Sequence, residues 1–412
     1  MAKSNDERSH MGIAEPAWWN EREVNVSNVM RCGVGLVCAV ILLLGCAGRL
    51  AKPAVARGDF PGRANAQRTG VYNTEGPRKM TDTVVFFTKP GKLGFGVGTA
   101  SPVVAGDVAY FAAADSYLYA YDVKHQRELW RLNVGWLGSG CTPAVFDGVV
   151  YLGSMDSTLR AVDAVTGKER WRFRTRGDVI SSPVVEGDLV LFGGYDGNLY
   201  ALDVRTGAER WRYETRGGVG SSPAVAQEVV YFGSHDSCIY AIDLNTRQLR
   251  WKFKTGGVVE ATPAVAGGMV YCGSGDRYLH ALDAGAGQER WSFKTDSFVI
   301  AGAAVAKGVA YCGSQDGFLY ALDAETGSER WRFKTLGGIW SAPSVAGRTL
   351  YFGGGDRCLH ALDIETGQEL WKYETGAFPV YCSPVIAAGT VYFGHLSCQK
   401  PGMKPGALIG LR

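Results

Sequence analysis

Seven aspartates recur at one position of a repeated pattern, and carboxylates arranged in a ring could bind a divalent cation. They are Asp115, Asp156, Asp196, Asp236, Asp276, Asp316 and Asp356. Asp-Gly pairs such as Asp196-Gly197 are also common hairpin turns, because both residues tolerate the backbone angles that these turns require. The sequence therefore favours a turn role for these aspartates and predicts no metal site.

The histidines and cysteines do not show the spacing of a metal or catalytic site. The six histidines form no ligand cluster, and His280 and His360 replace a tyrosine in equivalent strands, where packing is the favoured role. The ten cysteines include no CxxC pair and no adjacent pair, so neither a zinc site nor a disulfide framework is indicated. Cys272 and Cys312 stand where other repeats have phenylalanine and are expected to be small core residues.

No arrangement of residues indicates an enzyme or a nucleic-acid-binding protein. A Ser-His-Asp set, a phosphate loop or a pair of catalytic carboxylates is not recognisable, so we expect no catalytic residues. The net charge is +3, and Lys and Arg recur once per repeat instead of forming one basic block. We therefore expect no nucleic-acid partner.

Two loop positions vary from repeat to repeat. Positions that stay constant serve the fold, whereas variable ones are free to serve a partner, and exposed Trp, Tyr and Met are typical anchors of protein interfaces. We predict a partner-binding surface on the face that carries these loops, and drift at unconstrained loop positions is the alternative. The candidate residues are Met155, Tyr195, His235, Glu260, Trp340 and Tyr381.

These loops belong to a tandem repeat of forty residues. The segment Ser181–Gly220 is followed at Ser221 by a second copy, and tryptophans mark the register at intervals of forty residues, with one interval of forty-one. A period of this size is typical of solenoids, propellers and arrays. We expect the tryptophans to dock neighbouring repeats against each other: Trp130, Trp171, Trp211, Trp251, Trp291, Trp331 and Trp371.

Each repeat predicts one blade of a β-propeller. Apolar residues alternate with polar ones and are rich in Val, Tyr, Phe and Leu, which is typical of strands. Turn residues separate four short runs, so the repeat reads as a four-stranded antiparallel meander. In the copy that begins at Ser181 the runs are Ser182–Val185, Leu189–Gly193, Leu199–Asp203 and Arg210–Thr215.

Prolines in the first run allow the blades to be counted. Proline cannot donate a hydrogen bond to a strand ladder, so we place it in the innermost strand, which lines a central channel. Seven copies have proline and one has alanine, which makes eight blades. The residues are Pro102, Pro143, Pro183, Pro223, Pro263, Ala303, Pro343 and Pro384.

The two ends of the repeat array complement each other. The last copy ends at Arg412 without an outer strand, and a spare strand, Thr83–Thr88, precedes the first copy. Pairing the two would close the ring and remove its exposed strand edges. We therefore predict an all-β fold, an eight-bladed β-propeller over residues 83–412 in which the amino-terminal strand completes the carboxy-terminal blade.

The amino-terminal segment is predicted to direct the chain to a membrane. Residues 32–45 form an apolar run that is too short to span a bilayer and reads as the core of a signal peptide. The sequence Leu-Leu-Gly-Cys at its end resembles a bacterial lipobox, which makes Cys46 the lipidation residue; a plain secretory signal or an uncleaved anchor is the alternative. We expect residues 1–29 to be a disordered extension or a mis-start, 30–46 a lipoprotein-type signal peptide, and 47–82 a tether and lead-in.

The turns between the third and fourth strands carry a family motif. Ala201–Trp211 (ALDVRTGAERW) and its copies Ala321–Trp331 and Ala361–Trp371 resemble the AxDxxTGxxxW motif of the pyrroloquinoline quinone-like (quinoprotein-type) propellers. Two copies depart from it, since Arg247 replaces the turn glycine and Lys124-His125-Gln126 replaces Lys-Thr-Gly. The resemblance implies the eight-bladed fold.

The superfamily that this motif indicates has a catalytic and a non-catalytic branch. The quinone-dependent dehydrogenases add calcium ligands, an Asp base and usually a vicinal disulfide, and this chain has no adjacent cysteines. The other branch includes the lipoprotein B component of the outer-membrane β-barrel assembly machine, which the chain resembles more. The resemblance implies a monomeric scaffold without cofactor, anchored by lipid and facing the periplasm, whose protein partners are outer-membrane assembly components. A quinone-dependent dehydrogenase, or a propeller that binds a small ligand or a cell surface, is the alternative.

Overall fold

The structure is a computed structural model that describes residues 42–43, 71–72, 74–88, 100–113, 115–135, 141–376, 378–395 and 407–412. The chain divides into two compact units, Met1–Val34 and Gly35–Arg412, and every described residue belongs to the second. The predicted lipidation residue Cys46 lies outside the described residues. The described part holds no helix with the length and apolar character needed to cross a bilayer.

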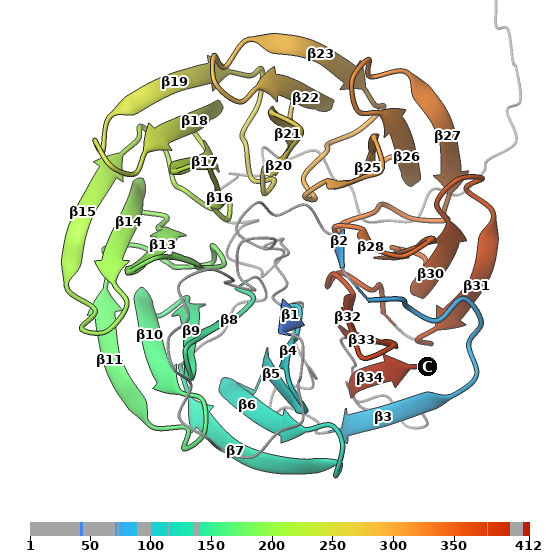
Figure 1. Cartoon of the computed structure of the whole chain (residues 1–412), viewed down its shortest axis with the longest axis horizontal. Helices are drawn as coiled ribbons and strands as arrows, with labels where there is room; N and C mark the ends of the chain where they lie inside the picture. Colours follow the sequence, from blue (N-terminus) through green and yellow to red (C-terminus); the bar gives the residue numbers. More distant parts are fainter. Residues whose placement is uncertain are drawn as a thin grey trace, which may run out of the picture. The chain divides into compact units, whose positions relative to one another are not determined.

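Eight four-stranded antiparallel sheets follow one another around a ring in the second unit (Figure 1). This arrangement confirms the predicted eight-bladed propeller. Blades 1 to 8 are numbered along the chain from their innermost strands, β4 (Val103–Ala105), β8 (Ala144–Phe146), β12 (Val184–Glu186), β16 (Ala224–Ala226), β20 (Ala264–Ala266), β24 (Ala304–Ala306), β28 (Ser344–Ala346) and β32 (Val385–Ala387).

The other three strands of each blade lie progressively farther out. The second strands are β5 (Val108–Ala112), β9 (Val149–Ser154), β13 (Leu189–Gly193), β17 (Val229–Ser234), β21 (Met269–Gly273), β25 (Val309–Gly313), β29 (Thr349–Gly353) and β33 (Thr390–His395). The third strands are β6 (Tyr117–Asp122), β10 (Thr158–Asp163), β14 (Asn198–Asp203), β18 (Cys238–Asp243), β22 (Tyr278–Asp283), β26 (Phe318–Asp323), β30 (Cys358–Asp363) and β34 (Ala407–Leu411). The outermost strands are β7 (Arg127–Asn133), β11 (Glu169–Arg174), β15 (Glu209–Glu214), β19 (Leu249–Lys254), β23 (Glu289–Lys294), β27 (Glu329–Lys334), β31 (Glu369–Glu374) and, in blade 8, β3 (Thr83–Thr88).

The prolines lie just outside the innermost strands, which corrects their predicted place. In blade 3, β12 begins at Val184, directly after Pro183, and the other blades that have proline here repeat this order. Proline has no N–H to give to the ladder, so pairing starts at the residue that follows it.

Two short strands of the amino-terminal part join the ring near its centre. β1 (Leu42–Leu43), inside the predicted signal peptide, pairs in parallel with β4, and β2 (Val71–Tyr72), inside the predicted lead-in, pairs in parallel with β28 (Figure 1). No strand was expected in the lead-in. A two-residue strand has no alternation of its own to reveal it.

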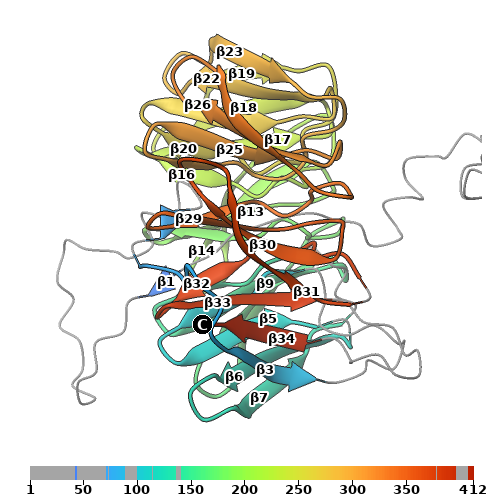
Figure 2. The same cartoon turned by 90° about the vertical axis from the view of Figure 1, so that its right-hand side faces the viewer.

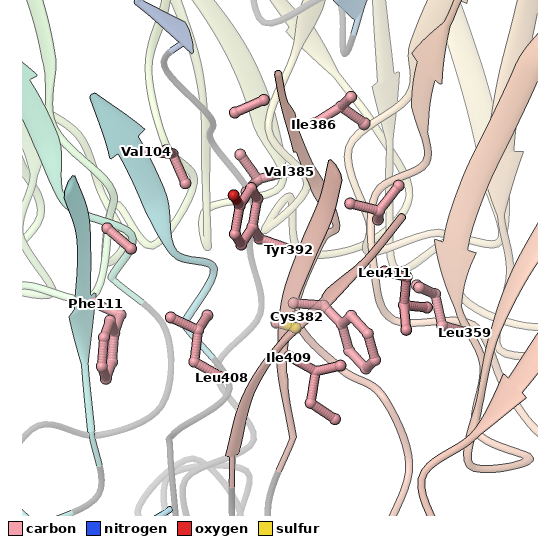
Figure 3. Close-up of a cluster of buried hydrophobic side chains, with 14 of the residues drawn as sticks. Val104, Phe111, Leu359, Cys382, Val385, Ile386, Tyr392, Leu408, Ile409 and Leu411 are labelled. Atoms are coloured by element: carbon pink, nitrogen blue, oxygen red, sulfur yellow. The ribbon is translucent and has the colours of Figure 1, made fainter. Parts of the chain in front are cut away.

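β3 closes the ring by pairing with β34 in antiparallel register from Thr83–Leu411 to Thr88–Ala407 (Figure 2). The pairing continues past the strand, because Arg412 N–H donates to the Asp82 carbonyl oxygen at 3.0 Å. Figure 3 shows the apolar core at this point, where Leu408, Ile409 and Leu411 of β34 lie between residues of blades 1 and 7. The predicted closure is confirmed.

Adjacent blades are joined at the outer rim by a repeated contact. The Trp171 indole N–H and the Tyr151 hydroxyl both donate to the Val204 carbonyl oxygen of the next blade at 3.1 Å. Gly207 of the same turn packs so closely on the indole of Trp171 that a Cβ atom would lie 2.6 Å from its ring. Its φ of +71° is also a backbone angle that glycine adopts without strain. Equivalent indole-to-carbonyl bonds are made by Trp130, Trp251, Trp291 and Trp331.

Blade 7 makes this contact with the lead-in. The Trp371 indole N–H and the Tyr351 hydroxyl donate to the Pro77 carbonyl oxygen at 3.1 and 2.9 Å. Arg78 adds an ion pair to Asp363 at 3.2 Å. Blade 8 has no covalent turn between its third and outermost strands, since both chain segments meet there. The Pro77 carbonyl oxygen therefore replaces the turn carbonyl oxygen that accepts the indole bond of Trp130, Trp171, Trp251, Trp291 and Trp331.

Candidate functional site

In blades 3 to 7, two loops of each blade are bonded together on one face of the ring. In blade 3 the Tyr195 N–H, in the hairpin between β13 and β14, donates to the Asp178 carbonyl oxygen, in the segment that leads into β12, at 2.9 Å. Equivalent bonds of 2.9 to 3.0 Å join His235 to Gly218, Gly275 to Val258, Gln315 to Phe298 and Gly355 to Gly338. We call the surface formed by these hairpins and lead-in segments the loop face. The two variable positions of the sequence therefore share one face.

Three of the candidate residues form a polar cluster on the loop face. The Glu260 carboxylate lies 3.0 Å from His235 Nε2 and accepts a hydrogen bond from the Tyr195 hydroxyl at 3.4 Å. The rings of Tyr195 and His235 meet edge to face, with centroids 5.0 Å apart. Burial, followed by the charge of Glu260, raises the pKa of Tyr195 well above its usual range. The tyrosine therefore stays a neutral donor, and the cluster presents one carboxylate on this face.

Two further candidates form an aromatic pair. Trp340 and Tyr381 meet edge to face with ring centroids 5.7 Å apart, and both are half-buried. Trp340 also packs on a small apolar cluster of Ile300, Ala301 and Ala342. Among the described residues, neither the Trp340 indole N–H nor the Tyr381 hydroxyl has a hydrogen-bond partner. The pair thus offers apolar surface together with two polar tips, which is typical of interface anchors.

The sixth candidate, Met155, stands apart from these groups. It occupies the hairpin position in blade 2 and is half-buried. Within the described part of the chain, no hydrogen bond, ion pair or ring contact joins it to the other five. The five other candidates thus form two groups, which lie in the hairpins of blades 3 and 4 and in the segments that lead into blades 5, 7 and 8. In the segment that leads into blade 6, Ile300 occupies the repeat position of Glu260 and Trp340.

Side-chain hydroxyls link the blades just below the loop face. The Thr142 N–H donates to Ser182 Oγ at 3.0 Å, and the Ser182 N–H donates to Ser222 Oγ at 2.9 Å. The same link crosses the ring closure, where the Ser383 N–H donates to Ser101 Oγ at 2.8 Å. These bonds tie the lead-in segments of these blades to those of the next blade.

The hydroxyl links are interrupted beneath the candidate residues. Thr262 Oγ1 is buried without a partner among the described residues, and the equivalent residues of blades 6 and 7 are Gly302 and Ala342. Gly302 lies between its neighbours, since a Cβ atom there would come 3.3 Å from the Thr262 carbonyl oxygen and 3.6 Å from Ala342 Cβ. Sequence analysis missed this interruption, although the loss of Ser or Thr before the proline position is visible in the repeat.

A cavity of about 370 Å³ opens at the outer rim between blades 3 and 4. The rim contact is altered there, because Leu191 stands in place of the donor tyrosine and Arg247, at φ +62°, stands in place of the turn glycine. Among the described residues, the Trp211 indole N–H has no acceptor. Glu186, Asp188 and Glu228 share the lining with Arg210 and Arg247, so the cavity is polar and of mixed charge.

The six described cysteines are buried, and so are His280 and His360. Cys272 and Cys312 have no exposed surface, and burial raises the pKa of Cys312 to about 12. One group of side chains in the described part could hold a metal ion, namely Asp356, Cys358 and His360, whose ligand atoms all lie within 4.8 Å of one another. Sequence analysis passed over this group, since it assigned Asp356 to a turn and His360 to packing. The alternation Asp-x-Cys-x-His is the signal that could have revealed it.

His280 should make the stability of the protein depend on pH. Burial opposes its protonation, but hydrogen bonds to Asp276 at 3.1 Å and Glu289 at 2.7 Å outweigh burial and raise the pKa of His280. A raised pKa stabilises the fold fully below the unfolded pKa, and this contribution is lost as the pH rises through the folded pKa. The free energy of unfolding should therefore fall over that interval, measured by urea denaturation at a series of pH values.

The control replaces His280 by the residue of the neighbouring blades. Tyr240 and Tyr320 occupy the same place and donate to Asp236 and Asp316 at 2.6 and 2.9 Å. The His280→Tyr protein should keep the fold and lose this part of the pH dependence. Identical pH profiles for the two proteins would show that His280 does not bind its proton more tightly when folded.

Comparisons with known proteins agree with the fold. A family model described as "Beta-alanine-activating enzyme, beta-propeller" matches residues 140–388. No curated protein matches the sequence.

Solved structures with the same fold include two kinds of propeller, namely BamB and quinohemoprotein alcohol dehydrogenases. BamB from Moraxella catarrhalis is 19% identical, with a TM-score of 0.66 over 81% of this chain and 99% of that one. Quinohemoprotein alcohol dehydrogenase from Comamonas testosteroni is 15% identical, with a TM-score of 0.70 over 85% of this chain and 80% of that one. The related enzyme ADHIIG from Pseudomonas putida HK5 is 16% identical, with a TM-score of 0.70 over 84% and 78%. At these identities the likeness concerns the fold alone.

Proposed function

The chain belongs to the family described by the β-propeller of the beta-alanine-activating enzyme, and within it we propose a non-catalytic scaffold that binds a partner protein on the loop face. The observation that carries the proposal is the pairing of Trp340 with Tyr381 beside Ile300, on the same face as the cluster around Glu260. Trp and Tyr are enriched at binding hot spots, and the half-buried Glu260 adds a carboxylate on the same face. The family description names an enzyme, but it refers to its propeller part.

The loop face suits a partner with an apolar side chain and a hydrogen-bonding group. The aromatic pair supplies the apolar contact, and the free indole N–H and hydroxyl can each bind a partner's carbonyl or hydroxyl group. The Thr262 hydroxyl is an additional polar group below the surface. Regular blades with short loops support a scaffold role.

Replacing the aromatic pair should weaken partner capture. We expect Trp340→Ala combined with Tyr381→Ala to reduce capture of envelope proteins by the tagged chain at least tenfold, because aromatic anchors dominate binding energy. Stability should change by about 1 to 2 kcal/mol, since both side chains are half-buried. The measurement is quantitative pull-down from membrane extracts, in which outer-membrane assembly components are the expected partners by resemblance to lipoprotein B.

The matched control changes two exposed apolar residues away from the loop face. Val165, in the turn after β10, is 83% exposed, and Leu249, on the outer strand of blade 4, is 40% exposed. Their double alanine variant should capture partners like the parent chain. Equal capture by both double variants would show that the partner binds at another site.

The quinone-dependent dehydrogenase is the competing function, because two of the similar structures are alcohol dehydrogenases. The scaffold proposal expects neither stoichiometric uptake of pyrroloquinoline quinone in the presence of calcium nor alcohol-dependent dye reduction. Measured turnover would refute the scaffold.

We further propose that the protein is anchored in the bacterial cell envelope through Cys46 and faces the periplasm. The lipobox-like sequence Leu-Leu-Gly-Cys supports this location, and several acyl chains anchor a protein firmly. The Cys46→Ala protein should appear in the soluble fraction, whereas Cys38→Ala should stay with membranes. Membrane association of Cys46→Ala after a salt wash would contradict lipidation at this residue.

A further inference from the structure

We propose that Asp356, Cys358 and His360 of blade 7 form a binding site for a divalent transition metal of the zinc class. Cys358 and His360 alternate in β30 and share one face of the strand, and Asp356 lies in the preceding hairpin turn, in which Arg357 has a φ of +70°. The carboxylate, thiol and imidazole ligand atoms all lie within 4.8 Å of one another. Asp356 lies in a hairpin of the loop face, but none of the three residues is a candidate residue of the proposed function.

The local backbone fixes the carboxylate next to the imidazole. Asp356 Oδ1 accepts the Cys358 N–H at 3.2 Å, and Asp356 Oδ2 lies 3.1 Å from His360 Nε2. At Gly354 a Cβ atom would overlap Asp356 Oδ1 and come 3.3 Å from His360 Nε2. The equivalent residue is serine in blades 4, 5 and 6. Glycine therefore leaves space beside both ligand atoms.

The other nitrogen of His360 is held by a carboxylate. His360 Nδ1 lies 2.7 Å from Glu369 Oε1, where an Nδ1–H group would donate to the carboxylate. Phe352 stacks on the imidazole with centroids 4.9 Å apart, and Phe333 meets it edge to face at 5.5 Å. A carboxylate bound to Nδ1–H is the usual support of a metal-binding histidine, since it orients the ring and raises the basicity of Nε2.

His360 Nε2 and the two Asp356 oxygens lie as close together as two ligands of one metal ion. Ligand atoms bound to one tetrahedral zinc ion at about 2.0 to 2.3 Å lie about 3.3 to 3.7 Å apart. The nitrogen–oxygen distances of 3.1 and 3.2 Å are close to that range.

The Cys358 thiol distinguishes blade 7 from blade 5. In blade 5, His280 likewise lies between two carboxylates, those of Asp276 and Glu289, but Tyr278 stands in place of the cysteine. There His280 contacts the two carboxylates at 3.1 and 2.7 Å. Of these two blades, only blade 7 adds a sulfur atom.

Blade 4 provides the complementary comparison. It has Asp236 and Cys238, but Tyr240 replaces the histidine and donates to Asp236 at 2.6 Å. Among the described blades, blade 7 alone combines carboxylate, thiol and imidazole. Mixed oxygen, sulfur and nitrogen ligands suit zinc or cobalt, whereas magnesium and calcium prefer oxygen only. Three protein ligands leave one tetrahedral position for water or another ligand.

Cobalt titration of the full chain tests the proposal. The purified protein is freed of metal with a chelator and titrated with Co²⁺, whose thiolate complexes absorb by sulfur-to-metal charge transfer. We expect saturation at one equivalent, visible bands of tetrahedral strength, and complete displacement by Zn²⁺. Absence of the charge-transfer band at one equivalent would overturn the proposal.

Four variants identify the ligands. Cys358→Ser should abolish the charge-transfer band, and His360→Tyr, which introduces the residue of sister blades, should abolish the tetrahedral bands while the fold is kept. Glu369→Gln should weaken Zn²⁺ binding by about 10- to 100-fold, as loss of a supporting carboxylate does. Cys238→Ser should bind like the parent chain. A band that survives Cys358→Ser or disappears in Cys238→Ser would refute the assignment to blade 7.

Discussion

Removal of Thr83–Thr88 is expected to abolish the cooperative unfolding transition of the propeller. β3 is the outermost strand of blade 8, and its loss would leave unpaired those N–H and C=O groups of Ala407–Leu411 in β34 that face β3. The buried side chains of Leu408, Ile409 and Leu411 would lose their cover on that side. An exposed strand edge over an apolar face leads to aggregation or loss of the native packing. Thermal melting followed by circular dichroism, with light scattering in parallel, measures the result.

A rearranged chain tests whether the pairing of β3 with β34 is needed, and not the position of β3 in the chain. Because Arg412 N–H donates to the Asp82 carbonyl oxygen, the carboxy terminus already lies beside the start of β3. Moving residues 74–88 behind Arg412 through a short linker should therefore restore a cooperative melt. Deletion of Met1–Val29 should leave the melt unchanged. An intact transition after deletion of Thr83–Thr88 would contradict closure by this strand.

The blade count and the closure could be predicted because every blade repeats the same local signals. Alternation, turn residues and the tryptophan spacing each act within forty residues, and they agree with one another. The position of the prolines was predicted one residue too far into the strand, since the sequence shows a residue without N–H but not where pairing starts. Local signals therefore give the elements with small errors at their ends.

The lead-in could not be read in the same way. Pro77 acts through its carbonyl oxygen, which every residue has, so no side-chain pattern marks it. Only the arrangement of the ring shows that the Trp371 indole has no turn carbonyl of the next blade to bind, because blade 8 has no turn between β34 and β3. The contact joins residues 294 positions apart.

The candidate site was predicted as positions but not as contacts. Comparing repeats identified Tyr195 and Glu260 as variable, yet the hydrogen bond between them joins residues 65 positions apart in different blades. The group of Asp356, Cys358 and His360 was missed because each change from the consensus also occurs alone in another blade. The combination can be recognised as a metal site only from the structure, in which the three ligand atoms lie within 4.8 Å of one another.

Gly273→Ala should destabilise the propeller by about 3 kcal/mol, which is typical of overpacking in a rigid core. Gly273 ends β21, and a Cβ atom there would overlap the Val299 carbonyl oxygen and lie 2.6 Å from Val299 Cγ1. The carbonyl belongs to the backbone and cannot rotate away like a side chain. The Val299 N–H is also bonded to the Ser274 carbonyl oxygen at 3.3 Å, so a shift would break the link between the hairpin and the lead-in segment of the next blade. Equivalent glycines at positions 193, 233 and 353 meet the same backbone carbonyl in their own blades, so the effect should recur around the ring.

Gly285→Ala, in the same blade, is the matched control for this prediction. Gly285 has no positive φ, and the only atom near its added Cβ is Asp283 Oδ1 at 3.4 Å. The other blades carry larger residues at this turn position, for example Arg205 and Glu325. We expect Gly285→Ala to be neutral or to stabilise the fold by up to about 1 kcal/mol, because alanine restricts the unfolded chain more than glycine does. Urea unfolding of both variants measures the difference, and a Gly273→Ala protein as stable as Gly285→Ala would mean that the blades can separate at this contact without losing packing.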